Sequence, residues 1–409
     1  MKPVARPRTQ HAVIALGITQ IIGWGTTFYV PAILARPIAD DLGLPLLGVL
    51  GASSWALLLS GLLSRRIGAL IDRHGAASIL TSASLLAGCA LLLHAIADSL
   101  WLIWLAWSLI GLGMRAMLYD GAFAALAALA GPGSRRAISL LTLLGGLAST
   151  VFWPISHLLL ETVGWRGALA AFGAMNMLIC APLHYFFSGC QPQGTVGSAD
   201  KAAAAANPHE RSTTAPSPQW AEKAVLLIAT AFACHAFIWS SLAVHLPELI
   251  QGIGLSAGAA VAIAAMMGPA QVISRSAELL AQRWLSPLTL TVPVFAMLPL
   301  SLLLFALPIP AGIAATAFVL TYGFSNGLLT ILRGALPLML IGSRGYGELL
   351  GRLAAPSLVV SALSPLVLGQ VLESWGPTTA ACLLGLAGLG CTLAAVALVR
   401  HARTSDTRG

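Results

Sequence analysis

Gly68-Ala69-Leu70-Ile71-Asp72-Arg73-His74-Gly75 is a short polar segment between two long apolar runs, 47–64 and 77–97. Each run approaches or reaches the roughly 20 residues that a helix needs to cross a hydrocarbon core about 30 Å thick. Arg65 and Arg66 precede the segment, and Asp72 is its only acid. Loops rich in arginine are typical of the cytoplasmic side of membrane proteins. This part of the chain therefore predicts two transmembrane helices joined by a cytoplasmic loop.

The composition extends this interpretation to the whole chain. Of the 409 residues, 57% are hydrophobic and only 9% are charged, whereas about a quarter are charged in an average soluble domain. The mean hydropathy is +0.86. The formal net charge of +8 does not indicate a nucleic-acid-binding protein, because the basic residues are scattered rather than gathered on one face. We expect an integral membrane protein in contact with the lipid bilayer, with no nucleic-acid partner.

Twelve apolar runs have the length of a membrane span. The first run is longer than the 7–15 residues of a signal-peptide core, so we interpret it as a span and not as a secretion signal. The fold class is therefore expected to be all-α, with twelve transmembrane helices. The runs are 12–33, 47–64, 77–97, 101–129, 137–160, 167–187, 224–247, 257–280, 287–307, 311–341, 348–371 and 377–399.

The loop charges orient these spans. With the N-terminus in the cytoplasm, the outer segments contain only Arg36 and Arg166 among their basic residues, and the inner segments contain nearly all the others. Segments rich and poor in basic residues thus alternate along the chain, and an incorrect span count would disturb this alternation. Both termini are therefore predicted to be cytoplasmic.

The chain divides into two halves of six spans. Residues 188–223 are rich in Gly, Pro, Ser, Thr and Ala, which predicts a cytoplasmic linker between bundles at 1–187 and 224–409, the second with a short cytoplasmic tail. A Leu-Glu-x-x-Gly stretch precedes both the sixth span, at 160–164, and the twelfth, at 372–376. Repeated halves are typical of secondary transporters.

Enzyme and cofactor motifs are not found. No lysine follows a glycine-rich phosphate loop, and there is no Cys-x-x-Cys or paired Cys/His spacing, so we expect no cofactor and no metal. Gly254-Leu255-Ser256-Ala257-Gly258 matches a hydrolase nucleophile elbow in its letters, but no strand precedes it. Ser256 is instead expected to cap the helix that follows. The protein is not expected to be an enzyme.

The 68–75 segment resembles the loop motif of the major facilitator superfamily, Gly-x-Leu-x-Asp-Arg-x-Gly. Ala76 and Ala77 stand where two basic residues usually follow. The resemblance implies two six-helix bundles and alternating access, with Asp72 facing the start of the eleventh span. The alternative is that Asp72 is only solvated at the membrane surface. The residues implied to form a conformational latch are Gly68, Asp72, Arg73 and Gly75.

Two other family motifs bear on which kind of transporter this is. The fifth-span antiporter pattern, Gly-x-x-x-Gly-Pro-x-x-Gly-Gly, is absent, which lowers the expectation of drug/proton antiport without excluding it. Gly23-Trp24-Gly25 resembles the first span of monocarboxylate-porter-like members.

Arg115 and Asp120 lie in the fourth predicted span, and Arg333 lies in the tenth. Each costs about 2.5–3.5 kcal/mol on insertion scales, so each requires a partner or a water-filled cavity. On a continuous helix Asp120 would lie about 140° from Arg115, so we expect it to face a neighbouring helix instead. Arg275 and Glu278 are expected to pair at the inner end of the eighth span.

The resemblance further implies that the first, fourth, seventh and tenth spans line a central cavity. Arginine beside aromatic side chains suits an organic carboxylate, which a guanidinium binds through two hydrogen bonds. Arg333 could instead extend to the membrane surface, and His235 and the tryptophans could serve packing alone. With Thr19, the candidate cavity residues are Gln20, Trp24, Thr27, Arg115, Tyr119, His235, Trp239, Tyr322, Asn326 and Arg333.

We therefore expect a secondary active transporter, acting as a monomer, that moves a small organic solute by alternating access. Coupling to protons is expected, with Asp120 and His235 as candidate proton carriers. The alternatives are a proton-coupled exporter of toxic compounds and a non-transporting receptor with the same fold. Arginine greatly outnumbers lysine, which suggests a GC-rich bacterial genome and thus a bacterial inner membrane.

Overall fold

The computed structural model describes residues 6–188, 218–304 and 309–406. Most of the predicted linker, residues 189–217, lies outside this description. All the regular secondary structure in the described ranges is helical. The helices are α1 (Arg6–Gly23), η1 (Trp24–Phe28), α2 (Val30–Leu42), α3 (Leu46–His74), α4 (Ala76–Ala95), α5 (Leu100–Met117), α6 (Tyr119–Ala130), η2 (Gly131–Gly133), α7 (Ser134–Gly145), α8 (Ala148–Met175), η3 (Asn176–Cys180), α9 (Ala181–Ser188), α11 (Pro218–Gln251), α12 (Ala257–Ala265), α13 (Met267–Ala281), α14 (Pro287–Leu303), α15 (Ala311–Ile341) and α16 (Tyr346–Asp406).

Within the described ranges, eight helical segments are long and apolar enough to cross a membrane. Two of them are much longer than one crossing requires: Ser134–Phe186 has 53 residues and Tyr346–Thr404 has 59. Drawn straight at 1.5 Å per residue, they would extend about 80 and 90 Å, more than twice the thickness of a bilayer core. Each must therefore bend.

The bend in each long segment lies at a glycine. Gly164 has φ 70° and ψ 175°, and Gly376 has φ 78° and ψ 176°. Only glycine adopts this backbone region readily, because any Cβ would clash there. These are the two glycines of the repeated Leu-Glu-x-x-Gly stretch, so the repeat in sequence is also a repeat in backbone conformation.

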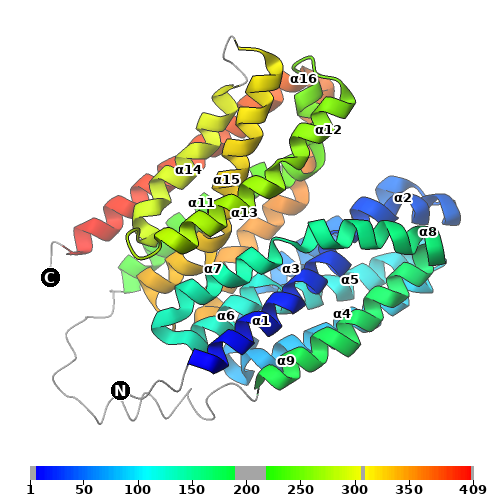
Figure 1. Ribbon diagram of the computed structural model, residues 1–409, viewed down its shortest axis with the longest axis horizontal. Helices are drawn as coiled ribbons and strands as arrows, with labels where there is room; N and C mark the ends of the chain where they lie inside the picture. Colours follow the sequence, from blue (N-terminus) through cyan, green and yellow to red (C-terminus); the bar gives the residue numbers. More distant parts are fainter. Residues whose placement is uncertain (1–5, 189–217, 305–308, 407–409) are drawn as a thin grey trace.

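The helices gather in two lobes (Figure 1). Helices α1 to α9 form one lobe, and α11 to α16 form the other. The lobes meet where α3 packs along α16 and where α7 contacts α13 and α15. The seam between the lobes is therefore built by segments far apart in the sequence.

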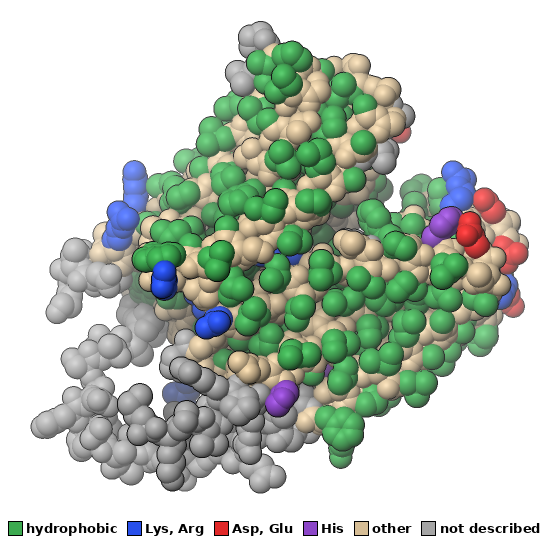
Figure 2. All heavy atoms as spheres, in the orientation of Figure 1, with side chains coloured by type: hydrophobic (Ala, Val, Ile, Leu, Met, Phe, Trp, Pro, Cys, Tyr) green, Lys and Arg blue, Asp and Glu red, His purple; other side chains and the backbone are tan. Residues whose placement is uncertain are grey.

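The surface of the molecule is largely apolar. Figure 2 shows hydrophobic side chains across the flanks of both lobes, while most charged side chains lie toward the two ends. Exposed leucines such as Leu62 on α3 and Leu393 on α16 would be unfavourable in water. These flanks suit a lipid environment, as expected of a multi-pass membrane protein.

Candidate functional site

A helix break between α5 and α6 brings two charged residues together. Leu118 has φ −81° and ψ −163°, an extended conformation that interrupts the helix. Arg115 Nη1 consequently lies 3.0 Å from Asp120 Oδ2, and Arg115 Nε donates to Ser64 Oγ. The sequence-based expectation that Asp120 cannot pair with Arg115 is wrong, because it assumed one continuous helix.

Arg333 completes a charged cluster, which we define as Arg115, Asp120 and Arg333. Arg333 Nη2 on α15 lies 2.7 Å from the same Asp120 Oδ2. The side-chain exposures are 2% for Arg115, 10% for Asp120 and 33% for Arg333. The cluster therefore joins the two lobes and has one net positive charge. Asp120 Oδ1 is buried and has no hydrogen-bond partner among the residues that the structure describes.

The break at Leu118 is stabilised from α1. It leaves the carbonyl of Met117 without its usual helical partner, and Gln20 Nε2 donates to that oxygen at 2.9 Å. Gln20 Oε1 in turn accepts from Trp24 Nε1 at 3.2 Å. Gln20 is fully buried, so its role in the structure is to hold α1 against the break.

An aromatic chain extends from the break across the seam between the lobes. Ring centroids lie 5.2 Å apart for Trp24 and Tyr119, 5.1 Å for Trp24 and Phe28, and 5.2 Å for Phe28 and Trp239. Tyr119 also stacks on Phe123 at 5.4 Å. Trp239 comes from α11 in the second lobe. Phe28 and Phe123 were not among the sequence-predicted residues, since a phenylalanine in an apolar run gives no signal of its own.

Two other predicted residues pair within the second lobe. His235 Nε2 lies 2.9 Å from Asn326 Oδ1, joining α11 to α15. Tyr322, one turn before Asn326, is buried and stacks on Phe318 with centroids 5.9 Å apart. Its hydroxyl has no partner within the described ranges.

Two predicted cavity residues point elsewhere. Thr27 in η1 is fully buried, and its hydroxyl donates to the oxygen of Gly23, the last residue of α1, at 2.5 Å. Thr19 donates to Leu16 O and contacts His184 Nε2 at 2.9 Å, and His184 also contacts Ser84 at 3.0 Å. His184 was not among the sequence-predicted residues, although a histidine inside an apolar run was a usable signal. Both threonine hydroxyls are therefore bonded within the first lobe.

Asp72 caps the start of α16. Its Oδ1 accepts from Gly347 N at 2.9 Å, and its Oδ2 accepts from Glu348 N at 2.7 Å. A carboxylate is favoured here because the first N–H groups of a helix are unpaired and carry partial positive charge. Asp72 is thus bound to the opposite lobe and is not merely solvated.

The other predicted latch residues surround Asp72. Gly68 packs directly on the backbone of Gly347, and Gly75, with φ 84°, ends α3. Arg73 is exposed. Beside them, Arg65 Nε lies 2.8 Å from Glu348 Oε1.

Comparison of the sequence with models of known protein families identifies the family of this chain. A family model described as the Major Facilitator Superfamily matches residues 15–351. The chain belongs to the major facilitator superfamily. No curated protein sequence matches it. This superfamily member is therefore a secondary transporter that binds a small-molecule substrate, and not an enzyme.

Solved structures share the fold of this superfamily member. The human organic anion transporter MFSD10 (TETRAN) has a TM-score of 0.65 at 18% identity, covering 95% of this chain and 100% of that one. The proton:xylose symporter XylE, bound to 6-bromo-6-deoxy-D-glucose, has a TM-score of 0.68 at 12% identity, covering 96% and 95%. FucP in the outward conformation has a TM-score of 0.67 at 13% identity, covering 94% and 98%. Identities this low establish the fold alone.

A second set of bonds between the lobes of this superfamily member involves α7 and α13. Arg135 Nε lies 3.0 Å from Glu278 Oε1, and Ser139 Oγ donates to Glu278 Oε2 at 2.6 Å. Arg275 Nη1 donates to Thr142 O at 3.0 Å. The predicted pair between Arg275 and Glu278 is therefore wrong, because each side chain reaches α7 instead. The spacing within one helix could not reveal a partner on another lobe.

Proposed function

We propose that this transporter moves a small organic anion by alternating access, coupled to protons. The observation that carries the proposal is the charged cluster of Arg115, Asp120 and Arg333, in which two arginines share one carboxylate oxygen. A net positive charge inside a membrane protein is costly unless an anion or water compensates it. A solute carboxylate would supply that compensation.

The arginines of the cluster retain donors for a solute. A guanidinium has five N–H donors, and Arg333 uses one of them on Asp120. Its side chain is also one-third exposed, so a solute in the seam can reach it. The aromatic chain from Trp24 to Trp239 offers a nearby apolar surface for the rest of the solute.

Proton coupling would act through Asp120. Protonation would remove the charge that holds both Arg115 and Arg333, and would weaken the bond between α6 and α15. A proton on Asp120 and an anion on the arginines would thus favour separation of the lobes at this point. His235, bound to Asn326, is the second candidate carrier.

The rival function is proton-coupled export of amphipathic toxic compounds. The aromatic chain would suit such compounds equally well, whereas the positive cluster favours anions. Deletion of the gene separates the two: sensitivity to toxic compounds supports export, and loss of growth on an organic acid supports anion transport.

We also propose a membrane topology of twelve crossings. Counting the segments broken at Gly164 and Gly376 as two crossings each, and adding α12 with α13 and then α14, gives twelve crossings. We place the bundles at 1–187 and 224–409, joined by 188–223, with both termini in the cytoplasm. We further propose a functional monomer in a bacterial inner membrane.

A ligand screen on the purified full-length protein tests the substrate class. Aromatic and aliphatic carboxylates, each matched with its neutral amide, are compared for their effect on the melting temperature. We expect stabilisation by a carboxylate, no effect of its amide, and loss of the effect in Arg333→Gln. Arg136→Gln, an exposed arginine outside the cluster, is the matched control. Equal stabilisation by the amides would refute an anionic substrate.

A further inference from the structure

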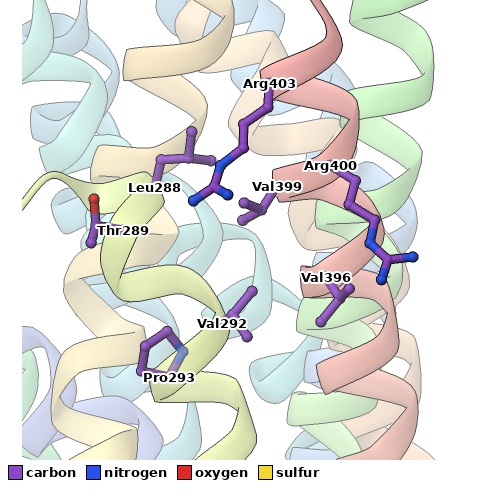
Figure 3. Close-up of a pocket in the computed structure, with 8 residues that line it drawn as sticks. All are labelled: Leu288, Thr289, Val292, Pro293, Val396, Val399, Arg400 and Arg403. Carbon is purple, nitrogen blue, oxygen red and sulfur yellow. The ribbon is translucent and has the colours of Figure 1, made fainter.

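A groove lies on the flank of the second lobe, away from the charged cluster. It has a volume of about 350 Å³ and separates the first two turns of α14 from the last turns of α16 (Figure 3). Its walls are apolar on both sides, with Val292 and Pro293 on α14 and Val396 and Val399 on α16. No acidic side chain is among its lining residues.

The mouth of the groove is positive. Arg403 extends from α16 toward Leu288 in the first turn of α14 (Figure 3). Arg400, one turn earlier, also lines the groove, but its guanidinium points away from α14. Both arginines are exposed. The N-terminus of a helix adds partial positive charge at the same place. An anionic group at the mouth would therefore meet a guanidinium on one side and a helix start on the other.

Exposed leucines lie further along the same two helices. On α16 the side chains of Leu393, Leu389 and Leu386 are 68%, 51% and 65% exposed, and Leu300 on α14 is 58% exposed. Leu393 lies about 15 Å along the helix from Arg403, which is half the thickness of a bilayer core. The distance from the mouth to these leucines thus matches the depth of one lipid leaflet.

Neighbouring residues place the mouth at the membrane interface. Trp284, just before α14, is 67% exposed and lies under the guanidinium of Arg283, whose Cζ is 3.9 Å from the ring centroid. Tryptophan and arginine are enriched at the level of the lipid headgroups. These two residues therefore favour a position of the mouth at headgroup level, with the floor in hydrocarbon.

The end of α16 is held in place by α11. Trp220 and His401 stack with centroids 5.1 Å apart, Trp220 Nε1 donates to His401 O at 3.3 Å, and His401 Nε2 lies 3.2 Å from Trp220 O. His401 lies between Arg400 and Arg403 in the sequence. The backbone that presents the two arginines is thus fixed before any ligand binds.

We propose that this groove binds an anionic phospholipid, with the phosphate at Arg403 and the acyl chains along the valine-lined floor. The apolar floor distinguishes this occupant from a free phosphate, which would use only the mouth. Basic pockets between membrane helices are known sites for anionic headgroups.

The test measures binding of phosphatidylglycerol to the full-length protein in detergent, by lipid-dependent shift of the melting temperature. Phosphatidylcholine, free glycerol phosphate and inorganic phosphate are compared with it. We expect stabilisation by phosphatidylglycerol alone, with the half-saturating concentration about 30-fold higher in the double variant Arg400→Gln/Arg403→Gln.

Two further variants separate the contribution of the arginine charges to lipid binding from that of the apolar floor. Arg66→Gln/Arg136→Gln removes two exposed arginines from the other lobe, and we expect it to bind phosphatidylglycerol as the unmodified protein does. Val396→Trp fills the floor while keeping both arginines, and we expect weaker binding. Equal binding in the Arg400/Arg403 variant, equal stabilisation by free glycerol phosphate, or no stabilisation by phosphatidylglycerol would each overturn the proposal.

Discussion

Replacing Asp120 by Asn tests the charged cluster most sharply. Asn has the same shape but no charge, so Arg115 and Arg333 would remain close together without their shared carboxylate. Removing one partner of a buried ion pair costs about 3–5 kcal/mol. Arg115 is 2% exposed, so the loss of its partner has its full cost there. Arg333 is 33% exposed and partly solvated, so the loss costs less at that side chain. We therefore expect the lower end, about 3 kcal/mol of lost stability.

A double-mutant cycle isolates the cause of this loss. In Arg115→Gln/Asp120→Asn the buried charges are removed together, and only the partly exposed Arg333 remains. We expect this double variant to recover most of the stability that Asp120→Asn loses, without recovering transport. Stability is measured by denaturant titration of the purified protein in mild detergent. If Asp120→Asn loses less than about 0.5 kcal/mol, or if the two substitutions are additive, the cluster is not a coupled buried network.

Three further substitutions, the first with a matched control, test other parts of the structure. Gly347→Ala would place a Cβ 2.8 Å from Asp72 Oδ1, so we expect solute uptake to fall several-fold at unchanged membrane insertion. Gly385→Ala, whose Cβ meets nothing within 4 Å, should leave uptake unchanged, and equal uptake in both variants would contradict the close approach. Glu278→Gln removes the carboxylate that joins α13 to α7, and we expect about 1–3 kcal/mol of lost stability in the same titration; an unchanged midpoint would count against that bond. Gly376→Ala forces a Cβ into a glycine-only conformation and should cost about 1–3 kcal/mol, whereas a neutral result would show that the bend tolerates another backbone geometry.

The overall fold was largely readable from the sequence, because lipid imposes simple constraints on composition and span length. The apolar runs and the loop motif at 68–75 identified a helical membrane protein of the correct family. Ser256 was also predicted correctly as a helix cap, and its Oγ accepts from Ala259 N at 3.3 Å. These features depend on local chemistry, which a sequence displays directly.

The candidate site was harder to predict from the sequence than the fold, because its geometry depends on contacts between helices that are distant in the sequence. Leu118 is an ordinary apolar residue, and nothing at that position indicates that the helix breaks there. The break nevertheless determines that Asp120 pairs with Arg115. In the same way, Glu278 has a basic residue three positions away on its own helix, yet its partner is Arg135 on α7. Helical periodicity describes one helix at a time and cannot select among partners on several others.

The central claim is that anion movement is coupled to protons through Asp120. Its most direct test uses proteoliposomes that contain a pH-sensitive dye and the carboxylate that stabilises the protein best in the ligand screen. Under an imposed pH gradient, we predict that the carboxylate accumulates on the alkaline side, that protons move with it, and that Asp120→Asn abolishes both. Accumulation that is the same with and without the gradient would contradict the account.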